Sequence, residues 1–186
     1  MILGGIPAIA VVGAVGWWLG SPLFLSTMVQ EAFPLSAKAE VPANMTRGEV
    51  EGAMASLAKV NQQTSESMPG AVGARLKTGA LGDADSFHKG RGQVTIYRLS
   101  DGSGLVRLEG IDVTNGPDLH VYLTPHPGPA NRSDVHTPGY ADLGKLKGNG
   151  GSQNYPIPDD VDVAAQRSLV IYCQPFHVIF SVAQLQ

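Results

Sequence analysis

The one cysteine of this chain, Cys173, is the residue with the most reactive side chain to consider. A thiolate can take part in redox reactions, and an unpartnered thiol outside the cytoplasm is either protected by burial or used. A single thiol excludes an intramolecular disulfide and a zinc site built from several thiolates. We therefore treat Cys173 as a candidate redox residue, with His177 as the closest basic side chain along the chain.

Two other interpretations of Cys173 stay open. The residue follows Leu169 and Ile171 at the spacing of one strand face, so it can instead be a small apolar side chain of the core. It can also form a disulfide with a second chain, which the sequence of one chain does not test.

The five histidines form the second set of candidate groups, because imidazole is a common transition-metal ligand. No two of them have the i,i+2 spacing of a strand face or the i,i+4 spacing of a helix face. Metal binding would therefore need convergence in space, and we expect His88 and His120 to be the pair that converges. Asp85 and Asp118 would complete a site of nitrogen and oxygen ligands. The alternative is that His88 and Asp85 bond to each other and fix a loop.

No catalytic constellation is present in the sequence. It contains no Gly-x-Ser-x-Gly elbow, no His-Glu-x-x-His and no cysteine–histidine motif of a known type. The glycine-rich run at 148–151 lacks the Gly-Lys-Ser/Thr ending of a phosphate-binding loop. We therefore assign no catalytic residue.

Composition limits the fold that must position these groups. The chain has 186 residues and a net charge of −3, without a stripe of Lys and Arg that could contact phosphates, which argues against nucleic-acid binding. Its 23 glycines and 13 prolines interrupt short segments, as is typical of an all-β fold.

Alternation of apolar and polar residues predicts an all-β domain over residues 71–186. Strands are expected at 94–99 and 105–109, joined by a turn at Asp101-Gly102, and at 119–123, 169–173 and 176–182. The last two are apolar on both faces, so we expect them in the centre of a compact antiparallel β-sandwich or barrel-like sheet. Residues 124–160 are rich in Pro, Gly and Asn and should form long loops with one or two short strands.

The start of the chain predicts a membrane anchor. The first charged side chain is Glu31, and residues 2–20 are almost all apolar or small. Nineteen such residues in a helix would be about 28 Å long, which is enough to cross a bilayer core. Trp17 and Trp18 would lie at the interface. We expect residues 1–25 to be a retained transmembrane helix in the lipid bilayer, because a signal peptide has a basic start and a shorter apolar run.

A linker is expected between the anchor and the β domain, at residues 26–70. Thr46 and Glu49 have the spacing of a capping box, which predicts a short helix at about 46–60. Residues 62–70 are small and polar and are expected to be a flexible tether.

Three groups of residues resemble the DM-thirteen domain family, over roughly residues 70–186. They are Asp85-Ser86-Phe87-His88-Lys89-Gly90 with Gly92, Asn115-Gly116-Pro117-Asp118-Leu119-His120-Val121-Tyr122-Leu123, and Tyr172-Cys173 with Phe176 and Phe180. The resemblance implies a small β domain with an electron-transfer role. Residues 115–118 can also be explained as a turn, since Asn, Gly and Pro favour the turn that leads into the next strand.

The resemblance has implications for location and partners. The segments Ser21-Pro22-Leu23-Phe24 and Glu31-Ala32-Phe33-Pro34 are similar to the membrane-proximal part of bacterial members, which have one membrane span and face outwards. It therefore implies a cell-membrane protein with its C-terminal domain outside the cytoplasm and a redox partner protein. The cofactor could be a transition metal or a haem carried by the partner, and the sequence itself identifies neither. The alternative is a non-catalytic surface binding or adhesion module that uses the Pro/Gly-rich loops.

Overall fold

The computed structural model describes residues 40–69 and 72–186. The predicted anchor, residues 1–25, lies outside these described residues, as does the first part of the predicted linker. Within the described ranges, no helix is long and apolar enough to cross a membrane.

Two helices and nine strands are formed by the described residues. They are α2 (Arg47–Leu57), β1 (Gln63–Ser65), β2 (Val72–Asp83), β3 (Gly90–Leu99), β4 (Gly104–Val113), β5 (Leu119–Thr124), α3 (Arg132–His136), β6 (Ala141–Lys145), β7 (Gly150–Ile157), β8 (Ser168–Cys173) and β9 (Val178–Gln184).

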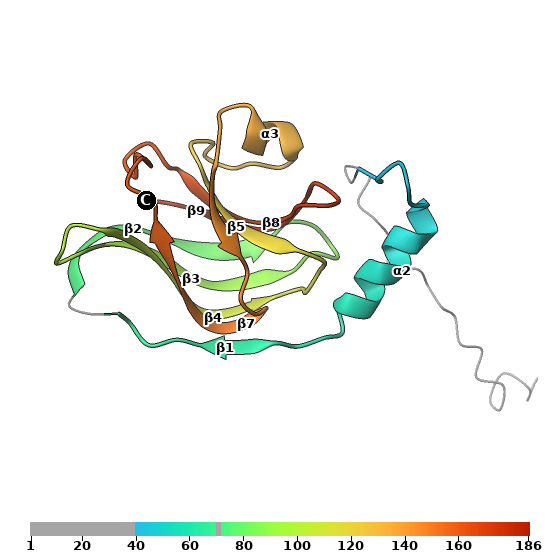
Figure 1. The fold of residues 1–186 in the computed structure, drawn as a ribbon, viewed down its shortest axis with the longest axis horizontal. Coiled ribbons are helices and arrows are strands. Elements are labelled where there is room, and N and C mark those ends of the chain that lie inside the picture. Colours follow the sequence, from blue (N-terminus) through green and yellow to red (C-terminus); the bar gives the residue numbers. More distant parts are fainter. Residues whose placement is uncertain (1–39, 70–71) are drawn as a thin grey trace, which may run out of the picture. The chain divides into compact units, whose positions relative to one another are not determined.

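The strands make one sheet in the order β1-β7-β4-β3-β2-β9-β8-β5-β6. β1 runs parallel to β7, and all other neighbours pair antiparallel. Strand twist accumulates across the sheet, which curls into a half-barrel (Figure 1). The predicted all-β class is therefore confirmed as a mostly β fold, and the expected sandwich or barrel-like domain is present as one sheet curled into a half-barrel.

The strands predicted from alternation are present. β3 and β4 are joined at Asp101-Gly102, and β5, β8 and β9 coincide with the other predicted segments. β8 lies between β5 and β9, and all six of its residues are buried. Apolar side chains on both faces thus place a strand in the interior of the sheet, as expected.

The two faces of the sheet carry two cores. The main core fills the inside of the curl, and α2 adds Val50 and Met54 to it. Each such buried side chain contributes about 1.5–3 kcal/mol. A smaller core lies on the other face of β5, β8 and β9 and includes Val135 of α3; its members are Tyr122, Val135, Val170, Tyr172 and Ile179.

Helix α2 begins with the predicted capping box. The Thr46 hydroxyl accepts a hydrogen bond from the Glu49 N–H at 3.3 Å, and the Glu49 carboxylate accepts one from the Thr46 N–H at 2.7 Å. The two side chains thereby satisfy backbone groups that an uncapped helix end would leave to solvent.

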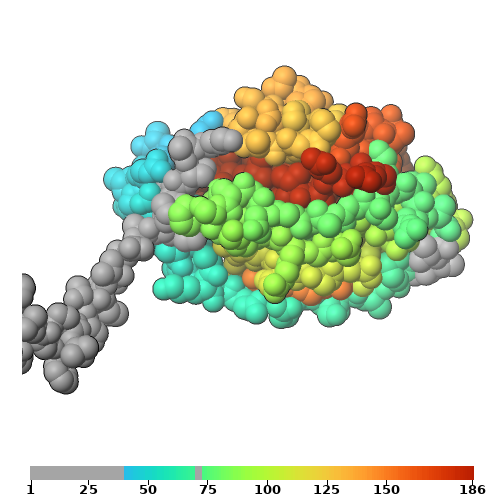
Figure 2. Space-filling view, turned by 180° about the vertical axis from the view of Figure 1, so that it is seen from behind, coloured from blue at the N-terminus to red at the C-terminus, as the bar shows by residue number. Residues whose placement is uncertain are grey.

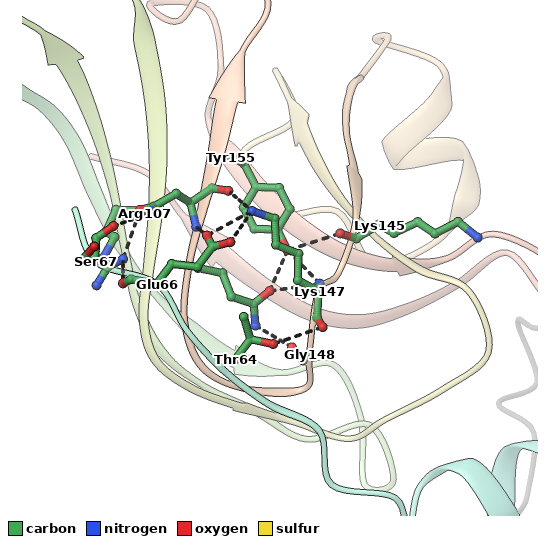
Figure 3. Close-up of polar contacts among 10 residues, drawn as sticks. Thr64, Glu66, Ser67, Arg107, Lys145, Lys147, Gly148 and Tyr155 are labelled. Atoms are coloured by element: carbon green, nitrogen blue, oxygen red, sulfur yellow. Dashed lines mark hydrogen bonds and ion pairs between the residues drawn. The ribbon is translucent and has the colours of Figure 1, made fainter. Parts of the chain in front are cut away.

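Part of the predicted flexible tether belongs to the sheet, which corrects the interpretation of residues 62–70. β1 reads Gln-Thr-Ser, with no apolar side chain that could have produced an alternating pattern. Polar contacts hold the segment instead (Figure 3). The Glu66 carboxylate accepts hydrogen bonds from Lys147 Nζ and from the Asn154 N–H, each at 2.7 Å. Arg107 Nη1 donates to the Glu66 carbonyl at 2.6 Å.

Removing this carboxylate should loosen β1. We expect Glu66→Ala to lower the free energy of unfolding by about 1 kcal/mol, because the Asn154 N–H loses its acceptor and a partly exposed ion pair is lost. Urea denaturation and amide exchange at Asn154 measure the effect. Glu66→Gln keeps an acceptor and is the control. Equal exchange rates in wild type and Glu66→Ala would contradict this account.

Residues 124–160 contain more regular structure than predicted. The expected short strands are β6 and β7, but α3 was not expected. Its five residues are too few to show helical periodicity. The only local signal is Asn131, whose side chain caps the helix by accepting from the Asp134 N–H at 3.1 Å.

Candidate functional site

The three sequence motifs meet in the main core around Phe180 of β9, at what we call the motif junction (His88, Gly116, Pro117, Cys173 and Phe180). The His88 ring lies 4.3 Å from the Phe180 ring, between centroids. A Cβ atom at position 116 would lie 2.5 Å from Phe180 Cζ, so any larger residue there would displace the Phe180 ring. Residues that are distant in sequence are therefore in direct contact.

The first motif forms a tight loop around Asp85. One carboxylate oxygen accepts from the backbone N–H groups of Phe87 and His88, both at 2.8 Å, and the other lies 2.8 Å from His88 Nδ1. Burial opposes ionisation of Asp85, but the hydrogen bonds from His88 and Phe87 outweigh it and hold its pKa below the ordinary value. This arrangement agrees with the loop-fixing role of the pair.

The second motif places His120 between two carboxylates. His120 Nδ1 is 3.0 Å from Asp142, and Nε2 is 3.5 Å from Asp118 on the other side of the ring. Asp118 also binds Lys145 Nζ at 2.6 Å, and that hydrogen bond is the main reason why its pKa is lowered. Gln174 donates to the Tyr122 hydroxyl at 2.8 Å and to Asp142 at 3.1 Å.

The four side chains of the predicted metal site do not gather into one group. His88 with Asp85 and His120 with Asp118 are present as two pairs, and the described part of the chain has no group of three or more His, Cys, Asp or Glu side chains that could hold a metal. The two histidines have different surroundings: His88 packs against Phe180 in the main core, whereas His120 lies between Asp118 and Asp142.

The remaining motif residues support the backbone. Gly92 has a φ of +128°, a backbone conformation that residues with a Cβ atom rarely adopt, and it packs against Ile111. The Asn115 side chain accepts from the Gly116 N–H at 3.0 Å. Phe87 is 41% exposed and lies at the surface of the first loop.

Cys173 is fully buried in the main core, where its thiol donates to the Pro117 carbonyl at 3.1 Å. Burial raises the pKa of the thiol to about 12, so the reactive thiolate is strongly disfavoured in the folded chain. This geometry matches the interpretation of Cys173 as a core residue.

Alkylation of Cys173 should be slow in the native chain. A pKa of about 12, against about 8.5 for a free thiol, lowers the thiolate fraction by more than about a thousandfold, and burial adds a steric barrier. Labelling kinetics at mildly alkaline pH measure this, with the urea-unfolded chain as the control. Rapid labelling of the native chain would show that the thiol is accessible.

A second group of chemically active side chains lies on the outer face of β5 and β8, under α3. We call it the Tyr–His cluster (Tyr122, Tyr140, Tyr172, His136 and His177). Tyr172 and Tyr122 stack with centroids 5.1 Å apart, and Tyr122 stacks on Tyr140 at 4.4 Å. Tyr140 is 40% exposed, so the stack leads from a buried ring to the surface.

Both histidines of the Tyr–His cluster point at the Tyr172 hydroxyl. His136 Nε2 lies 3.3 Å from this oxygen and His177 Nδ1 lies 3.2 Å from it. Burial, followed by the charge of Arg132, lowers the pKa of both imidazoles, which favours their neutral form. Burial raises the pKa of Tyr172 above the ordinary tyrosine value.

The cluster borders an open cleft over β9. In Figure 2, β9 is the dark red band between β2 (green) and the segment that carries α3 (orange). The cleft has a volume of about 620 Å³ and is lined by His177 together with Val178, Ile179 and Val182. His177 is thus in contact with Tyr172 on one side and with a solvent-accessible space on the other.

Sequence reasoning did not find the Tyr–His cluster. Its members come from β5, α3, the segment before β6, β8 and the turn before β9. No spacing within one element connects them. The one available signal was the alternation in β8, which points Tyr172 away from Ile171 and Cys173.

Comparison with known proteins gives one family. The family model described as "Electron transfer DM13" matches residues 83–185, which is more than half of the chain and includes all three motifs. No curated protein and no solved structure gives a significant match.

Proposed function

This chain belongs to the DM13 electron-transfer domain family, and from that premise we propose that it is an electron-transfer domain anchored to the cell membrane and facing away from the cytoplasm. The observation that carries the proposal is the match over residues 83–185.

The buried thiol is not the electron carrier in this proposal. Cys173 has no exposed surface, and burial raises its pKa to about 12. Redox chemistry of a thiol requires a thiolate that a partner can reach. Cys173 instead packs the motif junction, and the redox group lies elsewhere in the domain.

The proposed location rests on the first part of the sequence. Residues 2–20 are apolar or small and carry no charge on their side chains, which suits a helix in the lipid bilayer within residues 1–25. The similarity of residues 21–24 and 31–34 to the membrane-proximal segment of single-pass bacterial members favours a domain outside the cytoplasm. There it would exchange electrons with a redox partner protein.

The alternative, surface recognition through loops at residues 124–160, is less favoured. That segment forms α3, β6 and β7 and contributes Val135, which is fully buried, to the smaller core. A segment that packs in this way has less freedom to adapt to a partner than the long loops on which the alternative depended.

Electron flow to an external acceptor tests the proposal. Right-side-out membrane vesicles with and without the full chain are compared for reduction of ferricyanide, which does not cross membranes. We expect faster reduction with the full chain, and no gain from a variant that lacks residues 1–25. Equal rates with and without the full chain would sink the proposal.

A further inference from the structure

Three side chains from separate elements converge on one point of the Tyr–His cluster. His136 is the last residue of α3, Tyr172 lies in β8, and His177 lies in the turn before β9. Both imidazoles direct a nitrogen at the Tyr172 oxygen, from 3.3 Å and 3.2 Å. Two imidazole nitrogens and one phenol oxygen are a ligand set that transition metals use.

The two separations are hydrogen-bond contacts in the ion-free chain, and they are also compatible with ligand atoms around one ion. Around a tetrahedral ion with metal–ligand distances of about 2.0 Å, neighbouring ligand atoms lie about 3.3 Å apart. Hydrogen bonds between oxygen and nitrogen are most often about 2.9–3.0 Å long. The 3.2 and 3.3 Å separations at Tyr172 are closer to the first value.

The backbone of His177 has a left-handed conformation. Its φ is +52°, a left-handed conformation that is uncommon for a bulky side chain. Residues in such conformations cluster at active sites and ligand-binding positions. In this conformation, the ring contacts Tyr172 and also lines the cleft over β9.

Glu40 faces the other nitrogen of His177, at the distance of an ion pair rather than of a hydrogen bond. The Nε2 atom of His177, on the far side of the ring from Tyr172, lies 3.8 Å from Glu40 Oε2. Metal-bound histidines usually present their other nitrogen to a carboxylate or carbonyl oxygen. Glu40 also accepts hydrogen bonds from Arg132 Nη1 at 2.6 and 2.8 Å, so it offsets the charge of this guanidinium, which would disfavour a cation here.

We propose that His136 Nε2, His177 Nδ1 and Tyr172 Oη bind one copper ion, which acts as the redox group of this domain. Among the common divalent ions, Cu²⁺ binds imidazole most strongly, and it cycles by one electron. On binding, Cu²⁺ replaces the Tyr172 hydroxyl proton, which leaves to solvent. The ion then accepts one electron from the redox partner protein and becomes Cu⁺. It is reoxidised to Cu²⁺ when it passes that electron to an external one-electron acceptor. The stack from Tyr172 through Tyr122 to Tyr140 leads from the ion to the surface.

Titration of the metal-free full chain with Cu²⁺ in detergent micelles tests the site, using protein without a histidine tag. We expect one ion per chain, release of a proton, a visible phenolate-to-copper absorption band, and an EPR spectrum with splitting from two imidazole nitrogens. A chain that binds Zn²⁺ but gives none of these copper signals would overturn the assignment of a redox metal.

Matched variants locate the ion. Tyr172→Phe should abolish the absorption band. The double variant His136→Gln/His177→Asn should weaken Cu²⁺ binding by at least about tenfold, and asparagine at 177 tolerates the left-handed backbone. Tyr155→Phe and His120→Gln are controls, because Tyr155 bonds to Gln153 at 2.7 Å and His120 lies between carboxylates. Circular dichroism verifies that each variant is folded.

These experiments distinguish failure of the copper site from failure of the electron-transfer function on which the proposal rests. Unchanged copper binding and spectra in Tyr172→Phe and in the folded double variant would overturn the site, while ferricyanide reduction by vesicles could still support electron transfer. Copper bound as proposed, together with no effect of the chain on ferricyanide reduction, would leave the site intact and sink the function.

Discussion

Phe180→Ala should lower the free energy of unfolding by about 3–5 kcal/mol, the usual cost of removing a buried aromatic side chain. Phe180 is 1% exposed, and its ring contacts His88 and fills the space over Gly116. The substitution therefore opens a cavity where all three motifs meet. Chemical denaturation of the full chain in micelles measures the loss.

Phe87→Ala is the matched control for this prediction. Phe87 belongs to the same motif group as His88, but its side chain is 41% exposed, so its removal should cost well below half as much. If the two variants were equally stable, Phe180 would not be the packing centre of the motif junction.

Gly92→Ala is expected to destabilise the domain by at least about 2 kcal/mol, through two effects that add. The φ of +128° is strained for any residue with a Cβ atom. The new Cβ would also lie 2.7 Å from Ile111 Cα, which is backbone of the paired strand and cannot rotate away. Denaturant titration of the variant gives the size of the loss.

A second glycine separates these two effects. Gly102 has φ of +89° in the β3–β4 turn, and no atom lies within 4 Å of where its Cβ would be. Gly102→Ala therefore reports backbone strain alone and should cost less than Gly92→Ala. Equal losses of stability in the two variants would mean that the chain relieves the contact with Ile111 without an energetic cost.

The sequence was sufficient for elements that carry a local signal. Alternation located β5, β8 and β9, the Asp101-Gly102 turn fixed the β3–β4 hairpin, and the capping box placed the start of α2. β1 and α3 have no such signal. β1 is polar and lies at the sheet edge, and α3 is shorter than two helical turns, so tertiary contacts decide both.

The candidate site was less predictable than the fold, because it depends on which strand faces meet. The motifs indicated that His88 and His120 matter, but each has a neighbouring carboxylate within reach and does not converge with the other. His136 and His177 were not paired from sequence, since a short helix and a left-handed turn bring them to Tyr172. Only a folded sheet places these three atoms together.

The most direct test compares two variants in the vesicle assay for ferricyanide reduction. Electron transfer through the Tyr–His cluster predicts that Cys173→Ala keeps the wild-type rate, while the folded double variant His136→Gln/His177→Asn lowers the chain-dependent rate by at least about tenfold. The opposite pattern, with loss of the rate in Cys173→Ala and a wild-type rate in the double variant, would contradict the account and make the buried thiol the electron carrier.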